Sequence, residues 1–199
     1  MKLTINTQNI FFASDWHLFH NSVIKPEFDD RPFDNIHQMH DELVENWNSV
    51  VTNDDYVFYT GDLSFGSRNK TLPIIKELNG KIHFVMGNHD KYKDIKKLDK
   101  FVDIVDYYDL TVLDDTVTEG KHPGKQLICM MHYPIISWNC KGYGSWMVHG
   151  HCHGKLMKSQ PEIYEQKIID VGCMNHNYIP ISYEELRNEM NTRIIKTFD

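Results

Sequence analysis

The stretch "VHGHCHGK" at residues 148–155 places His149, His151 and His153 within five positions, and a glycine stands on each side of the His-Cys-His core. Imidazoles at this density suit a metal-binding tag, part of a zinc finger, or one piece of a larger metal site. These three interpretations differ in where the remaining ligands come from. The rest of the chain therefore decides what the stretch is for.

Length, composition and charge limit the choices. A chain of 199 residues predicts one domain over 1–199, long enough to bury a core. A net charge of −7 argues against a broad electrostatic grip on a nucleic-acid backbone. No segment approaches the roughly 20 apolar residues of a membrane helix. The N-terminal residues have no signal-type apolar core, and the four cysteines form no Cys-x-x-Cys pair, so we expect a cytoplasmic protein. Oligomeric state is left open.

Short apolar segments alternate with helical patterns along the chain. Strands are predicted at residues 10–13, 56–59, 81–86, 127–131, 146–149 and 167–171, each followed by a Gly, Asn, Asp or His cluster. The stretch "FDNIHQMHDELVENWNSVV" has apolar residues at helical spacing, with Asp34 able to cap its start. This alternation predicts an α/β fold with helices layered on sheet.

Three further helices and a hairpin are predicted. One helix runs from about residue 71 to 78 with Pro73 in its first turn, and another covers 92–101. Ser182, with Glu185 three residues later, forms a capping box for a last helix. Residues 103–120 predict an exposed strand and hairpin.

Residues that can bind metals follow five consecutive predicted strands. In α/β folds, ligands collect at the carboxyl ends of the strands. In an extended segment, residues i and i+2 point the same way, so we expect Asp15 and His17 to face one side and Trp16 the other. The candidates, in chain order, are Asp15 and His17, then Asp62, then Asn88 with His89 and Asp90, then His132, then His151 and His153.

The number of candidate ligands predicts two metal ions. A structural zinc takes four ligands, usually in Cys-containing frames that this chain lacks. Mixed imidazole, carboxylate and amide ligands suit manganese, our first choice, or iron, zinc or nickel better than calcium or magnesium. Two divalent ions outweigh the charges of Asp15 and Asp62. Such a positive pair, typically about 3.5–4 Å apart, suits a phosphate ester.

The motifs Asp15-x-His17, Gly61-Asp62, Gly87-Asn88-His89-Asp90, His132 and Gly150-His151-x-His153 together resemble the calcineurin-like metallophosphoesterases, in particular small bacterial and phage members. The resemblance implies a four-layer sandwich of two β-sheets flanked by α-helices. It also implies a site in which Asp15, His17 and His153 hold one metal. Asn88, His132 and His151 would hold the second, Asp62 would bridge the two, and His89 would be the general acid.

One motif departs from the family pattern. Members that act on phosphoproteins extend the second motif to Gly-Asp-x-x-Asp-Arg, whereas this chain has Phe65 and Gly66 at the last two positions. The carboxylate that orients the catalytic histidine and the arginine that grips phosphate are therefore missing, which disfavours a protein phosphatase. Asp90 is one candidate to orient His89. Equally, it could hold its own turn through a side chain–backbone hydrogen bond.

Five other residues near the motifs have two possible roles each. His149 is expected in a core or supporting role rather than as a ligand. His20 could touch substrate or support a ligand. Arg31 could grip a phosphate oxygen or form a surface salt bridge. Tyr133 and Trp138 could stack on a base or simply pack. None of them establishes a substrate-binding residue.

The sequence thus predicts a dinuclear metal-dependent phosphoesterase in which a metal-bridging hydroxide attacks phosphorus and His89 protonates the leaving group. The substrate is expected to be a small phosphomonoester or phosphodiester, such as a nucleotide. Nucleic acid stays open as a partner, although the charge does not indicate it. The alternatives are a catalytically inactive binding protein with the same fold, a purely structural metal protein, and a nuclease acting on nucleic-acid ends.

Overall fold

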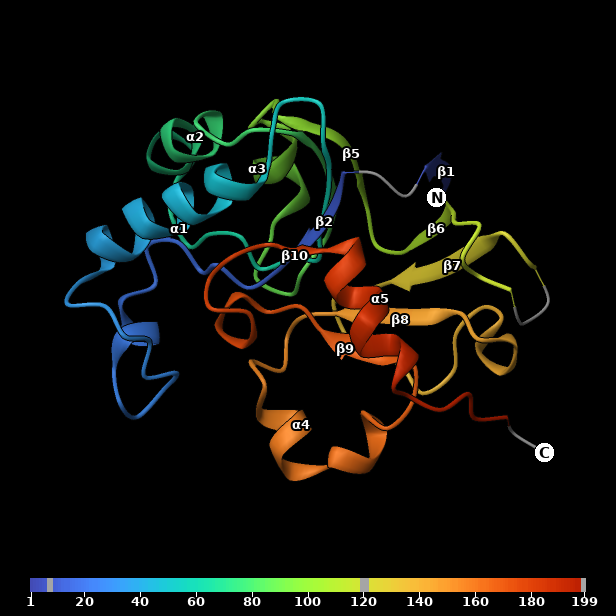
Figure 1. The fold of residues 1–199 in the computed structure, drawn as a ribbon. Coiled ribbons are helices and arrows are strands. Elements are labelled where there is room, and N and C mark those ends of the chain that lie inside the picture. Colours follow the sequence, from blue (N-terminus) through green and yellow to red (C-terminus); the bar gives the residue numbers. More distant parts are fainter. Residues whose placement is uncertain (7–8, 119–121, 198–199) are drawn as a thin grey trace.

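The computed structural model describes residues 1–6, 9–118 and 122–197, which form two five-stranded sheets (Figure 1). The first sheet has the order β1 (Lys2–Asn6), β6 (Tyr108–Leu113), β7 (Lys125–Met130), β8 (Trp146–His149) and β9 (Ile168–Asp170). The second has the order β10 (Ile181–Ser182), β2 (Ile10–Ala13), β3 (Tyr56–Tyr59), β4 (Lys81–Val85) and β5 (Phe101–Val105). All pairings are parallel except β6 with β7 and β10 with β2.

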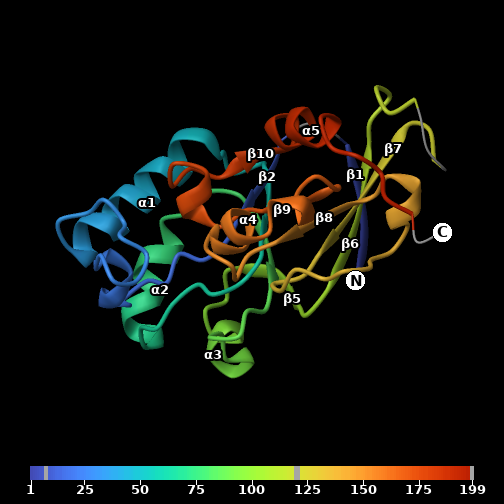
Figure 2. The ribbon, with the colours of Figure 1, turned by 90° about the horizontal axis from the view of Figure 1, so that it is seen from below.

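Apolar clusters on both faces of each sheet confirm the expected four layers. Helices α1 (Ile36–Val50), α2 (Arg68–Lys76) and α3 (Tyr92–Lys96) cover the outer face of the second sheet. A second cluster fills the space between the sheets, and it includes residues of α5 (Tyr183–Asn191). A third cluster lies on the other face of the first sheet, where Trp138, Leu156 of α4 (Lys155–Ser159) and Tyr164 pack over strand residues. Figures 1 and 2 both show α1 and α2 at one end of the molecule, away from α5.

The six predicted strands are all present, with small shifts at their ends. Two strands, β1 and β10, were not predicted. β1 is an edge strand with a single buried residue, Ile5, and β10 has only two residues, so neither shows a clear apolar pattern. The predicted exposed strand at 103–120 is wrong in part, because Tyr108, Leu110 and Val112 of β6 are buried between the sheets. The hairpin with β7 is confirmed, although residues 119–121 lie outside the described residues.

The helix ends correct the predictions for two helices and confirm that for a third. Helix α2 begins at Arg68 rather than near residue 71, so Pro73 lies inside the helix and not in its first turn. Helix α3 ends at Lys96, and Phe101 instead begins β5, where it packs on Phe84 with ring centroids 4.6 Å apart. The capping box of α5 is confirmed, since Ser182 Oγ accepts from the Glu185 N–H at 3.2 Å.

The cap of α1 is Asn35 and not Asp34. The extended backbone of Asn35 directs its Oδ1 toward the N–H groups of His37 and Gln38, each 3.0 Å away. Asp34 lies one residue before the cap position. Its own backbone N–H donates to Gln38 Oε1 of the first helical turn at 2.7 Å.

Two further points concern the whole chain. None of the helices in the described ranges has the length and hydropathy to cross a membrane. The parallel strands β2, β3 and β4 end at the same edge of their sheet, and a bridge between Ser14 and Gly172 connects this edge to the other sheet. The loops after the strands of both sheets therefore meet at one place.

The cap assignment gives the first prediction. Substitution Asn35→Ala removes an acceptor for two helix N–H groups and should lower the free energy of unfolding by about 1 kcal/mol. The matched substitution Asp34→Ala removes no acceptor of α1 and should change it by less than about 0.5 kcal/mol. Urea denaturation of both variants in the presence of a chelator measures the difference. Equal effects would contradict the assignment.

Candidate metal centre

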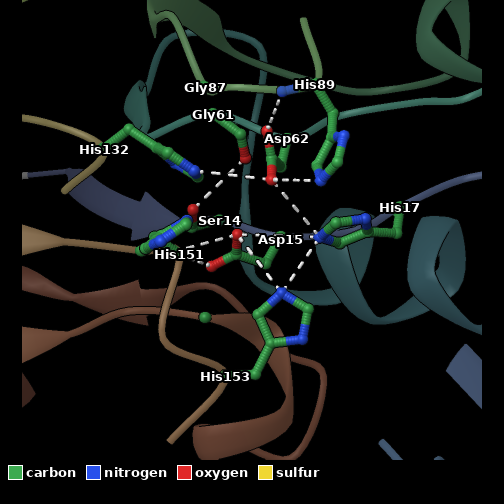
Figure 3. A network of polar contacts seen from close by, with 12 residues as sticks. Ser14, Asp15, His17, Gly61, Asp62, Gly87, His89, His132, His151 and His153 are labelled. Atoms are coloured by element: carbon green, nitrogen blue, oxygen red, sulfur yellow. Dashed lines mark hydrogen bonds and ion pairs between the residues drawn. The ribbon is translucent and has the colours of Figure 1, made fainter. Parts of the chain in front are cut away.

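The loops that follow β2, β3, β4, β7 and β8 bring all seven predicted ligands together. Figure 3 labels all of them except Asn88. The side chains form two groups, and within each group the potential ligand atoms all lie within 4.8 Å of one another. The first consists of Asp15, His17 and His153, and the second of Asp62, His132 and His151. Asn88, the seventh candidate, contacts the second group.

The first group is a buried carboxylate facing two imidazoles. His17 Nε2 lies 3.0 Å from His153 Nε2, and each of these nitrogens lies 3.9 Å from Asp15 Oδ1. The Asp15 carboxylate is fully buried and accepts the His151 N–H at 3.0 Å. That hydrogen bond joins the first group to the loop that carries the second.

The second group is arranged around the Asn88 amide. Its Oδ1 lies 2.9 Å from His132 Nε2 and 2.9 Å from His151 Nδ1. His132 Nε2 also lies 3.4 Å from Asp62 Oδ2. Three loops thus contribute donor atoms to this group.

Asp62 lies between the two groups. Its Oδ2 is 3.6 Å from His17 Nε2 on one side and 3.4 Å from His132 Nε2 on the other. Its Oδ1 is held by the His89 N–H at 2.9 Å. One oxygen facing both groups is the arrangement that a bridging ligand requires.

The backbone of the ligand loops is left-handed rather than extended. Asp15, His17, Asp62, His151 and His153 have φ values between 49° and 70°. The expected convergence of the side chains is therefore correct, but the reason given from i and i+2 spacing is wrong. Such conformations are uncommon for residues other than glycine and cluster at functional sites. Trp16 does turn away as predicted, into the core against Trp47.

Glycines let the loops approach one another closely. A Cβ on Gly61, which has a φ of +96°, would lie 2.6 Å from Gly87 Cα and 2.7 Å from His132 Nδ1. A Cβ on Gly150 would lie 2.6 Å from Asp15 Oδ2. Any side chain at these positions would displace a candidate ligand.

Two of the histidines are oriented by acceptors behind them. His132 Nδ1 lies 2.7 Å from the Thr60 carbonyl oxygen, and His153 Nδ1 lies 2.6 Å from Asp29 Oδ2. Because these oxygens only accept, Nδ1 carries a proton in each ring, and the Nε2 that faces the centre is the nitrogen available to a metal in the neutral form.

Sequence reasoning missed Asp29. Its side chain is 2% exposed, and its carboxylate also pairs with Arg31 at 3.2 Å and Lys155 at 3.2 Å. Burial alone would raise the pKa of Asp29, but the hydrogen bond from His153 and the charges of His153 and Arg31 outweigh burial and lower it. Asp29 lies in a segment without strand or helix periodicity, so no pattern marked it.

Arg31 is buried, so its position does not suit contact with a phosphate, and the salt bridge that it was predicted to form is present but lies inside the protein. It is 2% exposed, and it donates to the carbonyl oxygens of Trp16 and Asp15, each at 2.9 Å. Arg31 therefore braces the backbone of the first motif, with Asp29 as its counter-ion.

Asp90 holds loops together and does not orient the His89 ring. One of its oxygens accepts from the N–H groups of Asp62 at 2.7 Å and Gly87 at 2.9 Å, and the other from Leu63 at 3.1 Å. The turn-holding alternative was therefore the correct one, and it extends to a second loop.

An aromatic contact stands where the family carboxylate is missing. The ring of Phe65 lies 4.7 Å from that of His89, 4.3 Å from His20 and 5.5 Å from His17, measured between centroids. The His89 side chain is 46% exposed, and its Nε2 lies 4.0 Å from Asp62 Oδ2. Phe65 is thus the side chain that packs beside His89, and the sequence marked it only as a departure.

The remaining candidates divide between core and surface. His149 is fully buried with Nε2 3.0 Å from the Tyr164 hydroxyl, which confirms the core role. Trp138 is also buried and donates to the Ser145 carbonyl at 3.1 Å, so it packs. Tyr133 is 40% exposed, with its ring 4.6 Å from that of His151. The ring of His20 lies beside that of His17, at 5.7 Å between centroids, which leaves both of its predicted roles open.

The charge states of the buried ligands suit a cation. Burial, reinforced by His153, lowers the pKa of His17 to about 2, so this imidazole is neutral and free to bind metal. Burial, reinforced by Asp170, raises the pKa of Asp15 to about 7. The donor set of imidazole nitrogens, carboxylates and one amide oxygen fits a borderline divalent transition metal in each group.

A sequence model described as calcineurin-like phosphoesterase matches residues 9–155, which hold all seven ligands. The chain belongs to this family. Its match includes β2 and every loop of the centre through the start of α4. The family and the two donor groups together support a metal-dependent phosphoesterase.

The chain is also similar to three proteins whose names state no activity. The chain is 30% identical to an uncharacterized protein of Methanocaldococcus jannaschii over 183 residues, covering 90% of each chain. It is 24% identical to the Gene 66 protein of Mycobacterium phage D29, covering 92% of this chain and 96% of that one. A crystal structure of a protein of unknown function from Aquifex aeolicus superimposes with a TM-score of 0.67 at 25% identity, covering 90% of this chain and 98% of that chain.

The support from Asp29 is testable. Substitution Asp29→Asn removes the charge behind His153 and should weaken metal binding at the first group by about 10- to 100-fold. The neighbouring substitution Asp30→Asn changes an exposed carboxylate and should have no effect. Calorimetric metal titration measures both, with circular dichroism to verify folding. Equal affinities in the two variants would show that Asp29 does not orient His153.

The raised pKa of Asp15 predicts a pH dependence. In the metal-free protein, Asp15 binds a proton below about pH 7 that the unfolded chain has already lost, so its contribution to stability falls as pH rises from about 4 to about 7. A cation needs the ionised carboxylate. Manganese should therefore raise the melting temperature more at about pH 7.5 than at about pH 5.5. An equal increase at both pH values would contradict this ionisation.

Proposed function

We propose that this protein is a dinuclear metal-dependent phosphoesterase that hydrolyses phosphomonoester or phosphodiester bonds. The observation that carries the proposal is the position of Asp62 Oδ2, within 3.6 Å of imidazole nitrogens from both ligand groups. His89 stands at the same carboxylate without belonging to either group. A pair of metal sites with an ionisable side chain beside it is suited to phosphoryl chemistry.

Each group would hold one ion through the ligands described above, with manganese as our first choice and iron, zinc or nickel as alternatives. When bound, two such cations supply charge that holds the phosphoryl oxygens and lowers the pKa of water. The side chains set this arrangement in advance, since Thr60 and Asp29 orient the imidazoles and Asp90 fixes the loop of Asp62. Preorganised groups of this kind need little rearrangement during the reaction.

His89 is proposed as the general acid. Its backbone N–H holds Asp62 Oδ1, and its ring lies beside Phe65 at the exposed edge of the centre, as Figure 3 shows for His89 and Asp62. There the ring could hold a proton on Nε2 and give it to the departing oxygen. A leaving group with a high pKa gains most from this proton transfer.

The substrate is proposed to be a small phosphoester such as a nucleotide. The missing carboxylate and arginine at Phe65 and Gly66 argue against phosphoproteins, and the net charge of −7 argues against tight, nonspecific binding of nucleic acid. The four free cysteines support a reducing, cytoplasmic location. The alternative of an inactive binding protein is disfavoured, because every ligand and His89 are in place.

The acid role of His89 is tested by His89→Asn. This variant should bind metal normally and lose about 10²–10⁴-fold in turnover on an alkyl ester, because a poor leaving group needs the proton. The loss should be much smaller on a p-nitrophenyl ester. Histidine His37 on α1 offers the matched control, since His37→Asn changes an imidazole outside the centre. Full activity of His89→Asn on the alkyl ester would refute the role.

Metal content is tested separately. Protein freed of metal with a chelator and then loaded with manganese should bind two ions per chain, and Asp62→Ala should weaken both, whereas Asp15→Ala should weaken chiefly one. Elemental analysis and titration give the counts. Fewer than two ions in the unsubstituted protein would remove the basis of the dinuclear proposal.

A further inference from the structure

A cavity adjoins the metal centre on the side of His89. It has a volume of about 330 Å³, within the usual range of roughly 300–1,000 Å³ for small-molecule sites. Asn88 and His89 belong to its lining and also to the centre. The other walls come from the loop after β3 and from α2 and α3, which lie on the same side of the molecule in both views (Figure 2).

The position of this cavity fixes which part of a substrate it would hold. A general acid stands next to the leaving oxygen, and the metals hold the other phosphoryl oxygens. A group attached to the leaving oxygen would therefore extend past His89, away from the ligands of both metal groups. The cavity is the space that such a group would enter.

The lining of the cavity is apolar inside and cationic at the rim. Ile95 and Leu98 are 5% and 3% exposed and provide buried aliphatic surface, while the ring of Phe65 is 44% exposed. Arg68 and Lys91 are exposed and line the same cavity. A flat ring suits the apolar part, and a negative charge suits the rim.

The arginine is held in place before any ligand arrives. Arg68 Nε donates to the Lys97 carbonyl oxygen at 2.9 Å, and its two terminal nitrogens make no hydrogen bond within the described ranges. The acidic residues at the cavity are already engaged. Asp90 accepts backbone N–H groups with both oxygens, and Asp94 pairs with Lys97 at 3.9 Å. Positive charge therefore remains available at the rim.

We infer that this cavity is the leaving-group subsite, and that it selects a leaving group combining a flat ring with a negative charge, as a nucleotide does. The inference rests on the proposed function and names the substrate class for the same site. Arg68 and Lys91 set specificity by pairing with the anion of the leaving group. Phe65, Ile95 and Leu98 contact its ring.

A pair of synthetic esters isolates the charge. Methyl phenyl phosphate and methyl 4-carboxyphenyl phosphate transfer the same phosphoryl group and differ only in a carboxylate on the leaving ring, and the corresponding monoesters extend the comparison. The variants are Arg68→Gln and Lys91→Gln. The matched controls are Lys76→Gln on α2 and Lys93→Gln on α3, which remove the same charge outside the cavity lining.

Each rim variant should lower kcat/KM on the carboxyphenyl ester about fivefold more than on the phenyl ester, which is the scale of one exposed ion pair. The double variant should widen this difference further, but to less than about 25-fold, because both cations face the same carboxylate and their effects are not independent. The controls should change neither ester. Equal losses on both esters, or no loss on either, would overturn the subsite while the phosphoesterase proposal stands.

A binding measurement tests the cavity without turnover. In the metal-free protein, 4-hydroxybenzoate, the released leaving group, should shift the methyl resonances of Ile95 and Leu98, and Arg68→Gln should weaken the titration whereas Lys76→Gln should not. Shifts elsewhere, or none, would count against the cavity. Absence of metal-dependent hydrolysis of every ester, by contrast, would remove the proposed function itself.

Discussion

A single carboxylate oxygen, Oδ2 of Asp62, lies within 4.0 Å of imidazole nitrogens from three separate loops. Much of the architecture around it serves to hold that oxygen in place. Asp90 accepts the backbone N–H of Asp62, and the other carboxylate oxygen of Asp62 accepts the N–H of His89. Removing such polar groups from water costs free energy, which a cation bound among them offsets. The fold therefore supports a cluster that its own packing would not favour.

The two sheets explain how the cluster can form at all. Parallel strands bring successive loops to one edge, and the bridge of Ser14 to Gly172 brings the edge of the second sheet next to the first. The three clusters of buried apolar residues hold the sheets and their covering helices together. The left-handed backbone at the ligands, which costs free energy, is tolerated because hydrogen bonds such as Asp15 N–H to Gly61 hold both loops.

Much of this could be predicted from the sequence, for physical reasons that also explain the failures. Strand ends are marked by a sharp change from apolar to polar residues, so the seven ligands could be identified and their convergence expected. Asp29 and Arg31 could not, because an irregular segment has no period, and its position depends on contacts with His153 and Trp16 that only the tertiary structure sets. The role of Phe65 was hidden for the same reason, since ring contacts with three histidines are not encoded by spacing. Asn35 and Asp34 are neighbours, and either side chain could accept hydrogen bonds from the start of α1. The backbone conformation of Asn35 decides that it is the cap, and the sequence does not show that conformation.

The segment after the last ligand motif has a consequence for how the protein is made. Asp170 at the end of β9 accepts the N–H groups of Gly154 and Gly172, Cys173 donates to the Asp15 carbonyl oxygen, and β10 pairs with β2. A nascent chain that has emerged only as far as His153 thus carries every ligand but lacks the contacts that close the loops around them. Because these contacts join distant parts of the chain, the loops of the metal centre can close only after β10 has been synthesised.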